Sequence, residues 1–252
     1  MSILAGIHAV KHALEAGETV AELLIEKGKK HPRINELVYL AKKRGIRVSF
    51  QPRQALDRLS EGVPHQGVVA RVGSGKGLRF ADWLAGLDME AKPVVLLLDG
   101  VTDLHNLGAC IRSADAAGCA GVVIPRDHAA DISSPVVAKA ASGALSRLPV
   151  LVVTNLVRAI KQLQEKGLWI VGLAGEAEAS IYQASLDGGI GLVMGAEGKG
   201  LRRLVRESCD QLLSIPLAGH VESLNVSVAA GIALFEAVRQ RDRRDEKGME
   251  AE

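Results

Sequence analysis

One segment near the C-terminus of this 252-residue chain places polar side chains where a buried helix would begin. In IPLAGHVESLNVSVAAGIALFEAV, residues 215–238, an apolar strand end passes through a glycine-bearing loop and a polar turn into an apolar helix. Ser223 and Asn225 stand on either side of Leu224 in that turn. Free N–H groups and the helix dipole at such a helix N-terminus favour an anion or a polar ligand. We therefore expect this segment to form one wall of an active site.

Three consecutive strands in the C-terminal half each end in a glycine-bearing loop, at residues 172–175, 195–200 and 215–219. Ligands of open α/β sheets bind beyond the carboxyl ends of the strands, and glycine allows a close approach to the backbone. Three such loops in a row predict a shared, backbone-lined pocket for a nucleoside-like ligand. We expect its lining to include Leu173, Ala174, Gly175 and Leu217. The alternative is that the glycines only end the strands.

A further segment, residues 98–118, could face the same crevice because its strand also stops at a carboxyl end. Asn106 is a candidate N-cap for the helix that follows. Arg112 lies in the second turn of that helix, and Gly108, four residues earlier on the same face, would clear space beside the guanidinium. The alternatives are that Asn106 only caps the helix, and that Arg112 is a surface charge or a partner of Asp115.

Residue spacing argues against several other kinds of site. A P-loop would need glycine at position 193 and Ser or Thr at position 200, where the chain has Val193 and Gly200. No G-x-G-x-x-G motif opens a helix after the first strand of either α/β part, which argues against a nucleotide-dependent oxidoreductase. The three cysteines have no C-x-x-C spacing and no clustered His, so we expect reduced thiols and no metal site.

The larger, C-terminal part of the chain alternates strands and helices. We predict strands at residues 93–101, 121–125, 149–154, 169–175, 190–195 and 211–219, and helices at 107–117, 134–146, 155–166 and 225–239. The first strand is a continuous apolar run, as a sheet buried on both faces requires. The predicted fold class is therefore α/β, a mostly parallel sheet with helices on both faces.

Residues 1–72 are predicted to form a smaller α/β module, with helices at 6–16, 32–44 and 53–60 and strands at 20–25, 46–50 and 67–72. This module holds 12 Lys and Arg against 7 Asp and Glu, a net charge of +5, whereas residues 73–252 hold 19 against 22, a net charge of −3. Such a basic module is compatible with nucleic-acid binding, although charge alone fits a solvated basic face equally well.

The remaining boundaries follow from glycine and charge. Residues 73–92 begin GSGKG and are expected to form a flexible linker with a short helix at 78–87. Residues 93–240 form the larger domain, and residues 241–252 a charged, frayed tail.

Composition favours a soluble protein. The chain is 48% hydrophobic but only 3% aromatic, which favours helices and buried strands over an all-β fold. Lys11 and His12 interrupt the apolar start, so no signal peptide is expected. No apolar run approaches the ~20 residues that span a bilayer. We therefore expect a cytoplasmic protein that does not contact membranes.

Three segments together resemble a known family. DGVTDLHNLGACIRSA, VMGAEGKGL and IPLAGHVESLNVSVAAGIALFEA are similar, in order and spacing, to the three motifs of the SpoU (TrmH-type) RNA ribose 2′-O-methyltransferases. The first seventy residues resemble that family's L30e-like substrate-binding domain. VTNLVRAIKQLQEKGLWIVGLAGEAEASIYQ is most similar to the branch that methylates a guanosine in the peptidyl-transferase P loop of 23S rRNA.

The resemblance implies properties that spacing alone does not give. It implies S-adenosylmethionine (AdoMet) as cofactor, ribosomal RNA as partner, a deep trefoil knot in a SPOUT-type domain, and a homodimer through that knotted domain. Carried over motif by motif, the catalytic residues are Asn106, Arg112, Glu197, Ser223 and Asn225. Gly195, Ile215 and Leu224 join the cofactor-binding residues, and Lys199 receives no role.

The implied reaction moves a methyl group from a sulfonium to a ribose 2′-oxygen. An arginine keeps its proton to a pKa of about 12–13.8, so we expect Arg112 to act as a cation that stabilises the alkoxide and grips a phosphate, rather than as the base. The proton would leave through that phosphate, Glu197 or water. Two other functions stay open: methylation of another rRNA or tRNA nucleotide, and a non-catalytic RNA-binding or assembly role.

Overall fold

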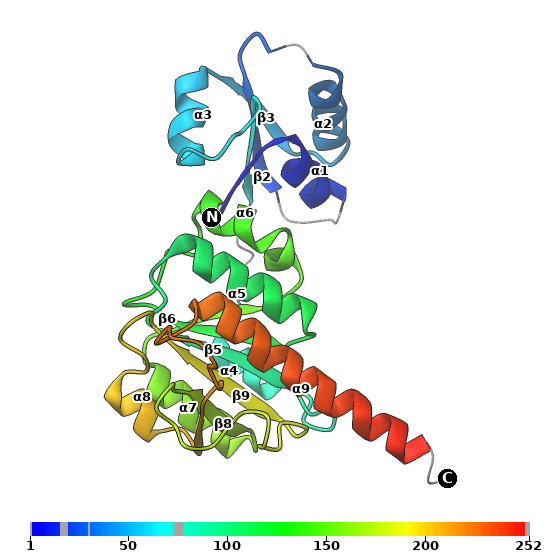
Figure 1. The fold of residues 1–252 in the computed structure, drawn as a ribbon. Helices are drawn as coiled ribbons and strands as arrows, with labels where there is room; N and C mark the ends of the chain where they lie inside the picture. Colours follow the sequence, from blue (N-terminus) through cyan, green and yellow to red (C-terminus); the bar gives the residue numbers. More distant parts are fainter. Residues whose placement is uncertain (1, 16–19, 30, 73–77, 250–252) are drawn as a thin grey trace.

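The computed structural model describes residues 2–15, 20–29, 31–72 and 78–249, with side chains for all of these except residues 2 and 243–249. Two α/β bodies follow one another along the chain (Figure 1). The first is built on a four-stranded sheet and the second on a six-stranded sheet. The predicted division into a small and a large α/β body therefore has a direct structural counterpart.

The N-terminal sheet has the order β1-β4-β2-β3, with β1 (Ser2–Ala5), β2 (Val20–Glu26), β3 (Arg47–Gln51) and β4 (Val68–Val72). Helices α1 (Ile7–Glu15) and α2 (Pro32–Lys43) pack on one face, and α3 (Arg53–Ser60) on the other. Strand β1 was not predicted. Its four residues are too few to show a pattern, and they are ordered by antiparallel pairing with β4.

The C-terminal sheet is entirely parallel and has the order β10-β8-β9-β5-β6-β7. Its strands are β5 (Val94–Asp99), β6 (Gly121–Pro125), β7 (Val150–Val153), β8 (Trp169–Leu173), β9 (Ile190–Gly195) and β10 (Gln211–Leu213). The chain proceeds outward from β5 to β7 and then returns to the other side of β5. The β5–β9 boundary is therefore the switch point at which open α/β sheets form their ligand crevice.

Helices cover both faces of this sheet, as predicted. Helices α5 (Leu104–Ala116), α6 (Pro135–Ala141) and α9 (Val226–Met249) enclose one core with it, and α4 (Phe80–Ala85), α7 (Leu156–Glu165) and α8 (Arg203–Glu207) the other. Figure 1 shows α5 and α9 side by side, with the end of α9 extending beyond the body. The core therefore fixes the start of α5 and the start of α9 over the same sheet.

Several predicted elements differ in extent from those in the structure. The strand predicted at 211–219 ends at Leu213, and the segment around Pro216 is a loop. The helix predicted at 134–146 breaks at Ser142 and Gly143, which have φ values of 51° and 88°, and resumes as a 3-10 turn, Ala144–Ser146. Helix α9 continues ten residues past its predicted end, because no Gly or Pro interrupts the charged run before Gly248.

Part of the segment predicted as a linker packs against the second sheet. Trp83 of α4 is buried, and its Nε1 donates to the carbonyl oxygen of Ala120 at 3.2 Å. The Trp83 ring lies so close to Gly121 that a Cβ there would approach it to 3.0 Å. Residues 80–87 therefore belong to the C-terminal body, whereas the glycine-rich residues 73–77 lie outside the described chain.

The two bodies touch through α6. The buried Ser134 hydroxyl, at the start of α6, donates to Glu61 at 2.9 Å, and the backbone N–H of Ile3 donates to Ser133 at 3.5 Å. Figure 1 shows α6 as the helix nearest the N-terminal body. Among the residues that the structure describes, no helix is long and apolar enough to cross a membrane.

Candidate active site

A cavity of about 370 Å³ opens at the carboxyl ends of β8, β9 and β10. All seven residues expected to bind the cofactor line it: Leu173, Ala174, Gly175, Gly195, Ile215, Leu217 and Leu224. Glu197 and Ser223, two of the expected catalytic residues, line it as well. Residues from three separate loops therefore meet in one place, at the edge of the sheet where ligands bind.

Sequence reasoning missed part of this lining. Met194 contributes an apolar wall, and Glu176 and Glu222 add two carboxylates to that of Glu197, whereas no Lys or Arg lines the cavity. Glu176 forms an ion pair with Arg206, which lies outside the lining. Glu176 directly follows the strand predicted at 169–175, and Glu222 lies in the polar turn of the segment 215–238, so these placements were the available signals.

Gly195 is required by the fold of the loop that follows β9. Ala196 and Gly200 exchange two backbone hydrogen bonds, with N···O distances of 3.1 and 2.9 Å. This tight turn folds back on Gly195, where a Cβ would lie 2.2 Å from the backbone carbon of Gly200. The glycines of this loop therefore form part of the cavity wall. Their role goes beyond ending the strand, which was the alternative explanation.

An ion pair between a buried carboxylate and a half-exposed guanidinium anchors the same loop to the sheet. Asp99, the last residue of β5, is fully buried. Its carboxylate accepts hydrogen bonds from three groups of Arg202: Nε and Nη2 at 2.6 Å and the backbone N–H at 2.8 Å. A carboxylate is rarely buried this completely unless it is paired. An Asp that ends an otherwise apolar strand was the available signal, and sequence reasoning did not use it.

Glu197, Asn106 and Asn225 form a hydrogen-bonded cluster at the cavity. Glu197 Oε1 accepts from Asn106 Nδ2 at 3.0 Å, from Asn225 Nδ2 at 2.7 Å and from the N–H of Val226 at 3.4 Å. Asn225 Nδ2 also lies 2.9 Å from Asn106 Oδ1. No described residue donates to Glu197 Oε2. One oxygen therefore holds the carboxylate in place and the other can accept a proton or a hydrogen bond.

Asn106 does not cap its helix, contrary to one reading of the sequence. Helix α5 begins three residues earlier than predicted, and the N-cap is Asp103, whose carboxylate accepts from the N–H of Asn106 at 2.7 Å. An Asp at the N-cap satisfies the orphan amides of the first turn. The side chain of Asn106 is thereby available for Glu197.

The expectation for Gly108 was wrong, and Arg112 lies apart from the cluster. A Cβ on Gly108 would lie 2.4 Å from the Cβ of Ala140, so this glycine lets α5 and α6 pack closely and clears no space for Arg112. Arg112 is exposed and makes no ion pair or hydrogen bond with the described residues, and Asp115 pairs with Arg147 at 2.6 Å. One copy of the chain does not bring Arg112 to Glu197.

Ser223 and Asn225 have different surroundings. Ser223 is exposed at the cavity. Asn225 Oδ1 accepts from the N–H of Ser227 at 2.9 Å, so Asn225 caps the first turn of α9 while its Nδ2 serves the cluster. This turn thus caps α9 through Asn225 and lines the cavity through Ser223 and Leu224.

Cys110 and Cys119 are buried free cysteines. Burial raises the pKa of Cys110 and of Cys119 to about 12, so both thiols stay protonated at neutral pH. Within the described chain, no group of three or more His, Cys, Asp or Glu side chains is placed to hold a metal ion.

Comparisons with known proteins agree with this geometry. The sequence profile of the SpoU rRNA methylase family matches residues 93–235, and that of the RNA 2′-O ribose methyltransferase substrate-binding domain matches residues 3–75. The chain is 50% identical over 240 residues to the 23S rRNA (guanosine-2′-O-)-methyltransferase RlmB of Escherichia coli K12, covering 94% of this chain and 97% of the relative. RlmB of Shewanella oneidensis is 51% identical over 240 residues, covering 95% and 97%.

Solved structures give the same assignment. The AdoMet-bound rRNA methyltransferase of Sinorhizobium meliloti is 25% identical with a TM-score of 0.79, covering 94% of this chain and 87% of that one. The SpoU methyltransferase AviRb of Streptomyces viridochromogenes is 27% identical with a TM-score of 0.77, covering 96% and 90%. With both profiles matched in order and relatives at half identity over nearly the whole length, the chain belongs to the SpoU rRNA methylase family.

Proposed function

We propose that this protein transfers the methyl group of AdoMet to the ribose 2′-oxygen of a guanosine in 23S rRNA. The observation that carries the proposal is Glu197, held by Asn106 and Asn225 at the mouth of a backbone-lined cavity at the strand ends. The relatives at half identity bear the name of this activity, and a structural neighbour at 25% identity is described as bound to AdoMet.

The residues of the cavity fit AdoMet. The apolar side chains of Leu173, Met194, Ile215 and Leu224 can enclose an adenosine, and the three loops offer backbone groups to its polar edges. The carboxylates of Glu176 and Glu222 suit the positive charges of the amino group and the sulfonium. We assign the seven lining residues named above, from Leu173 to Leu224, to cofactor binding.

When bound, AdoMet supplies a methyl group that is already activated on sulfur, so the protein must align the 2′-hydroxyl and remove its proton. Glu197 Oε2 is the atom to which we assign that proton, because Oε1 is occupied by three donors. Asn106 and Asn225 orient the carboxylate. Ser223, at the cavity, is assigned to the bound ribose or phosphate.

Arg112 completes this site, we propose, from a second copy of the chain. It lies exposed on α5 without a partner among the described residues, whereas its motif calls for it at the reaction centre. Neutralising an arginine at pH 7 would cost on the order of 7 kcal/mol. A charged guanidinium that stabilises the developing alkoxide and a neighbouring phosphate needs no such cost.

The Arg112→Lys variant tests this role. Lys keeps the positive charge but cannot form the bidentate hydrogen bonds of a guanidinium. We therefore expect the methyl-transfer rate to fall about tenfold or more at every pH, with no new inflection in the pH–rate profile. Single-turnover rates across pH 6–10 measure it. A rate that rises with pH in step with the titration of the new lysine would favour the general-base role instead.

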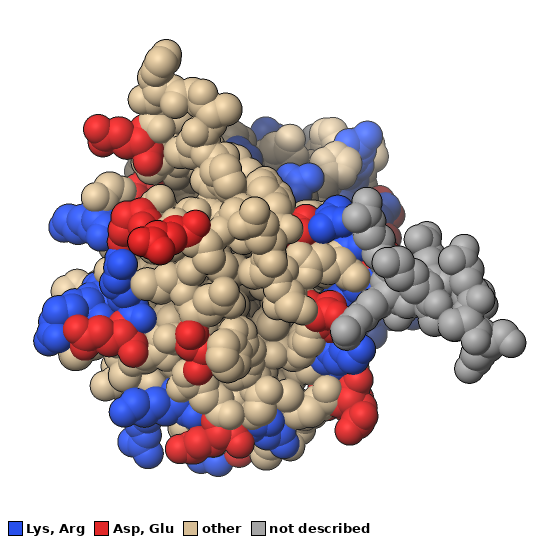
Figure 2. Space-filling model, turned by 60° about the horizontal axis from the view of Figure 1, so that its bottom comes forward, with Lys and Arg blue, Asp and Glu red and all other residues tan. Residues whose placement is uncertain are grey.

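The homodimer is proposed to form through the knotted domain. Val228 and Phe235 are seven residues apart on α9, so they share a face, and each is half exposed. Figure 2 shows a broad area without charges on the lower face of the C-terminal body, bordered by charged side chains. We expect a dimer by sedimentation equilibrium and a monomer for Phe235→Glu; a monomeric wild type would contradict the proposal.

The knot and the N-terminal module are proposed on similar grounds. The segment after β10 pairs with the segment after β8, through the bridge between Ser180 and Ser214, before the chain returns over the sheet as α9. This path suits a trefoil knot. Residues 1–72 would hold RNA that flanks the target guanosine. The resemblance places that guanosine in the peptidyl-transferase P loop. A protein that acts on rRNA would work in the cytoplasm.

Mapping of ribose methylation tests the function. Reverse transcription at low nucleotide concentration, across all rRNA and tRNA, should show one 23S guanosine that loses its methyl group when the gene is deleted and regains it with the wild-type gene. A lost mark in tRNA or at another rRNA nucleotide would change the substrate. An unchanged map together with defective ribosome assembly would support a non-catalytic role.

A further inference from the structure

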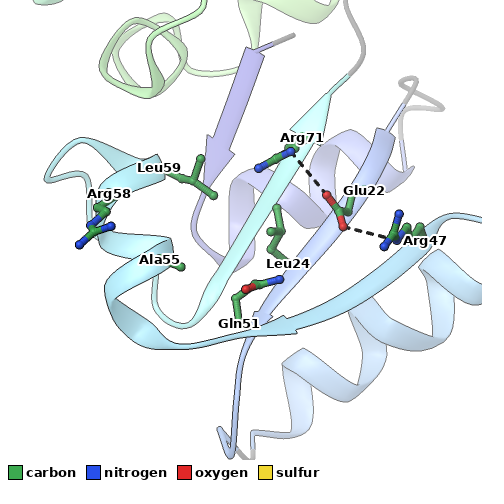
Figure 3. A pocket seen from close by; sticks show the side chains of 8 residues that line it. All are labelled: Glu22, Leu24, Arg47, Gln51, Ala55, Arg58, Leu59 and Arg71. Carbon is green, nitrogen blue, oxygen red and sulfur yellow. Dashed lines mark ion pairs between the residues drawn. The ribbon is translucent and has the colours of Figure 1, made fainter.

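A second pocket, of about 530 Å³, lies in the N-terminal body between the sheet and α3 (Figure 3). Strand residues Glu22, Leu24, Arg47, Gln51 and Arg71 form one side, and Ala55, Arg58 and Leu59 of α3 form the other. We propose that this pocket binds one nucleotide of the substrate RNA other than the methylated one. This inference rests on the proposed function, in which the N-terminal body holds flanking RNA.

The charge of the pocket selects an anion. The lining holds three arginines and a single carboxylate, which gives it a net charge of +2. The cofactor cavity has the opposite character, with three carboxylates and no cation. A phosphodiester is therefore attracted to the pocket beside α3.

Two of the arginines lie beside Glu22, with the side chain of Arg47 81% exposed and that of Arg71 41% exposed. Glu22 is largely buried and accepts from the Ser49 hydroxyl at 2.9 Å, which fixes its carboxylate. Arg47 Nε lies 3.7 Å and Arg71 Nη1 3.8 Å from its oxygens, close enough for an ion pair but beyond a hydrogen bond (Figure 3). No described residue accepts a hydrogen bond from either guanidinium. Their planar sets of donors thus remain available for a phosphate.

The rest of the lining suits a base and its sugar. Leu24 forms a buried floor, and the side chains of Ala55 and Leu59 point from α3 into the space above the sheet (Figure 3). Gln51 lies below Leu24 in Figure 3, and its amide can pair with a base edge. Arg58 points outward at the rim (Figure 3). An unstacked base of single-stranded RNA can lie on a guanidinium plane, and here guanidiniums stand beside an apolar wall.

The test compares two double variants of the full-length chain. R47Q/R71Q removes both guanidiniums beside Glu22, and the matched control R33Q/R44Q removes two exposed arginines at α2, on the opposite side of the same sheet. The probe is a fluorescent 23S rRNA transcript containing the peptidyl-transferase region, measured by anisotropy at several salt concentrations. We expect R47Q/R71Q to raise the Kd about tenfold or more and to lower the salt slope by about 1–2, and the control to raise the Kd about threefold at most.

Cross-linking adds a readout that folding defects would not mimic. With 4-thiouridine in the transcript, the wild-type chain should yield cross-linked peptides that include residues 47–59. Equal Kd increases in the two double variants, or cross-links confined to the α2 side, would overturn the pocket. AdoMet affinity should be unchanged in both variants. Because binding is measured apart from methylation, a wild type that binds RNA but leaves it unmethylated would contradict the proposed function and not this pocket.

Discussion

The Glu197→Gln variant is expected to lose about 100-fold or more of the methyl-transfer rate while it keeps its affinity for AdoMet within a few-fold. Gln has the shape of Glu and retains an oxygen for Asn106 and Asn225, so the cluster stays assembled. What disappears is the carboxylate charge and the basic Oε2 to which the hydroxyl proton is assigned. Single-turnover rates at saturating RNA, with AdoMet affinity from calorimetry, measure the two effects separately.

Glu207→Gln is the matched control. Glu207 ends α8 in the segment that follows the cavity loop, and it forms an exposed pair with Arg203 at 2.9 Å. Neutralising it should change the rate by less than about twofold, since exposed pairs contribute little. If Glu197→Gln kept a rate within threefold of wild type, the proton would have to leave by a phosphate or water, and the role assigned to Glu197 would be wrong.

The second large effect is expected from Arg202→Met, which should destabilise the protein by about 3–5 kcal/mol. Asp99 is fully buried, and without the guanidinium only the backbone N–H of residue 202 would face its charge. For a chain of this size the melting temperature should fall by roughly 10 °C. The loop that carries Glu197 would also lose its anchor to β5, so AdoMet should bind more weakly. Thermal and urea unfolding measure the first effect, calorimetry the second.

Two further variants isolate the ion pair. Adding Asp99→Asn to Arg202→Met removes the stranded charge and should recover at least half of the lost stability. Arg203→Met, at the next position, breaks only the exposed pair with Glu207 and should cost less than about 1 kcal/mol. Equal losses for Arg202→Met and Arg203→Met, or no recovery in the double variant, would show that the Asp99 pair does not stabilise the loop.

The sheet of the C-terminal body was predictable because its signal is local. A strand buried on both faces is expected to be almost continuously apolar, and PVVLLL, which precedes Asp99, and GVVIP satisfy that requirement without help from distant residues. Strand β1 and helix α8 were missed for the opposite reason. Four or five residues do not establish a period, and β1 owes its order to β4, more than sixty residues away.

The sequence by itself determined which residues could form the site: its motifs placed Asn106, Glu197 and Asn225 in segments that follow strand ends. Only the tertiary structure decided their geometry. Asn106 and Glu197 are 91 positions apart and Asp99 and Arg202 are 103 apart, so their contacts depend on strand order and on the switch point beside β5. Periodicity reports which face of an element is buried, whereas the partner of a polar side chain is set by the path of the whole chain. For the same reason Gly108, expected to make room for Arg112, proved to be the contact of α5 with α6.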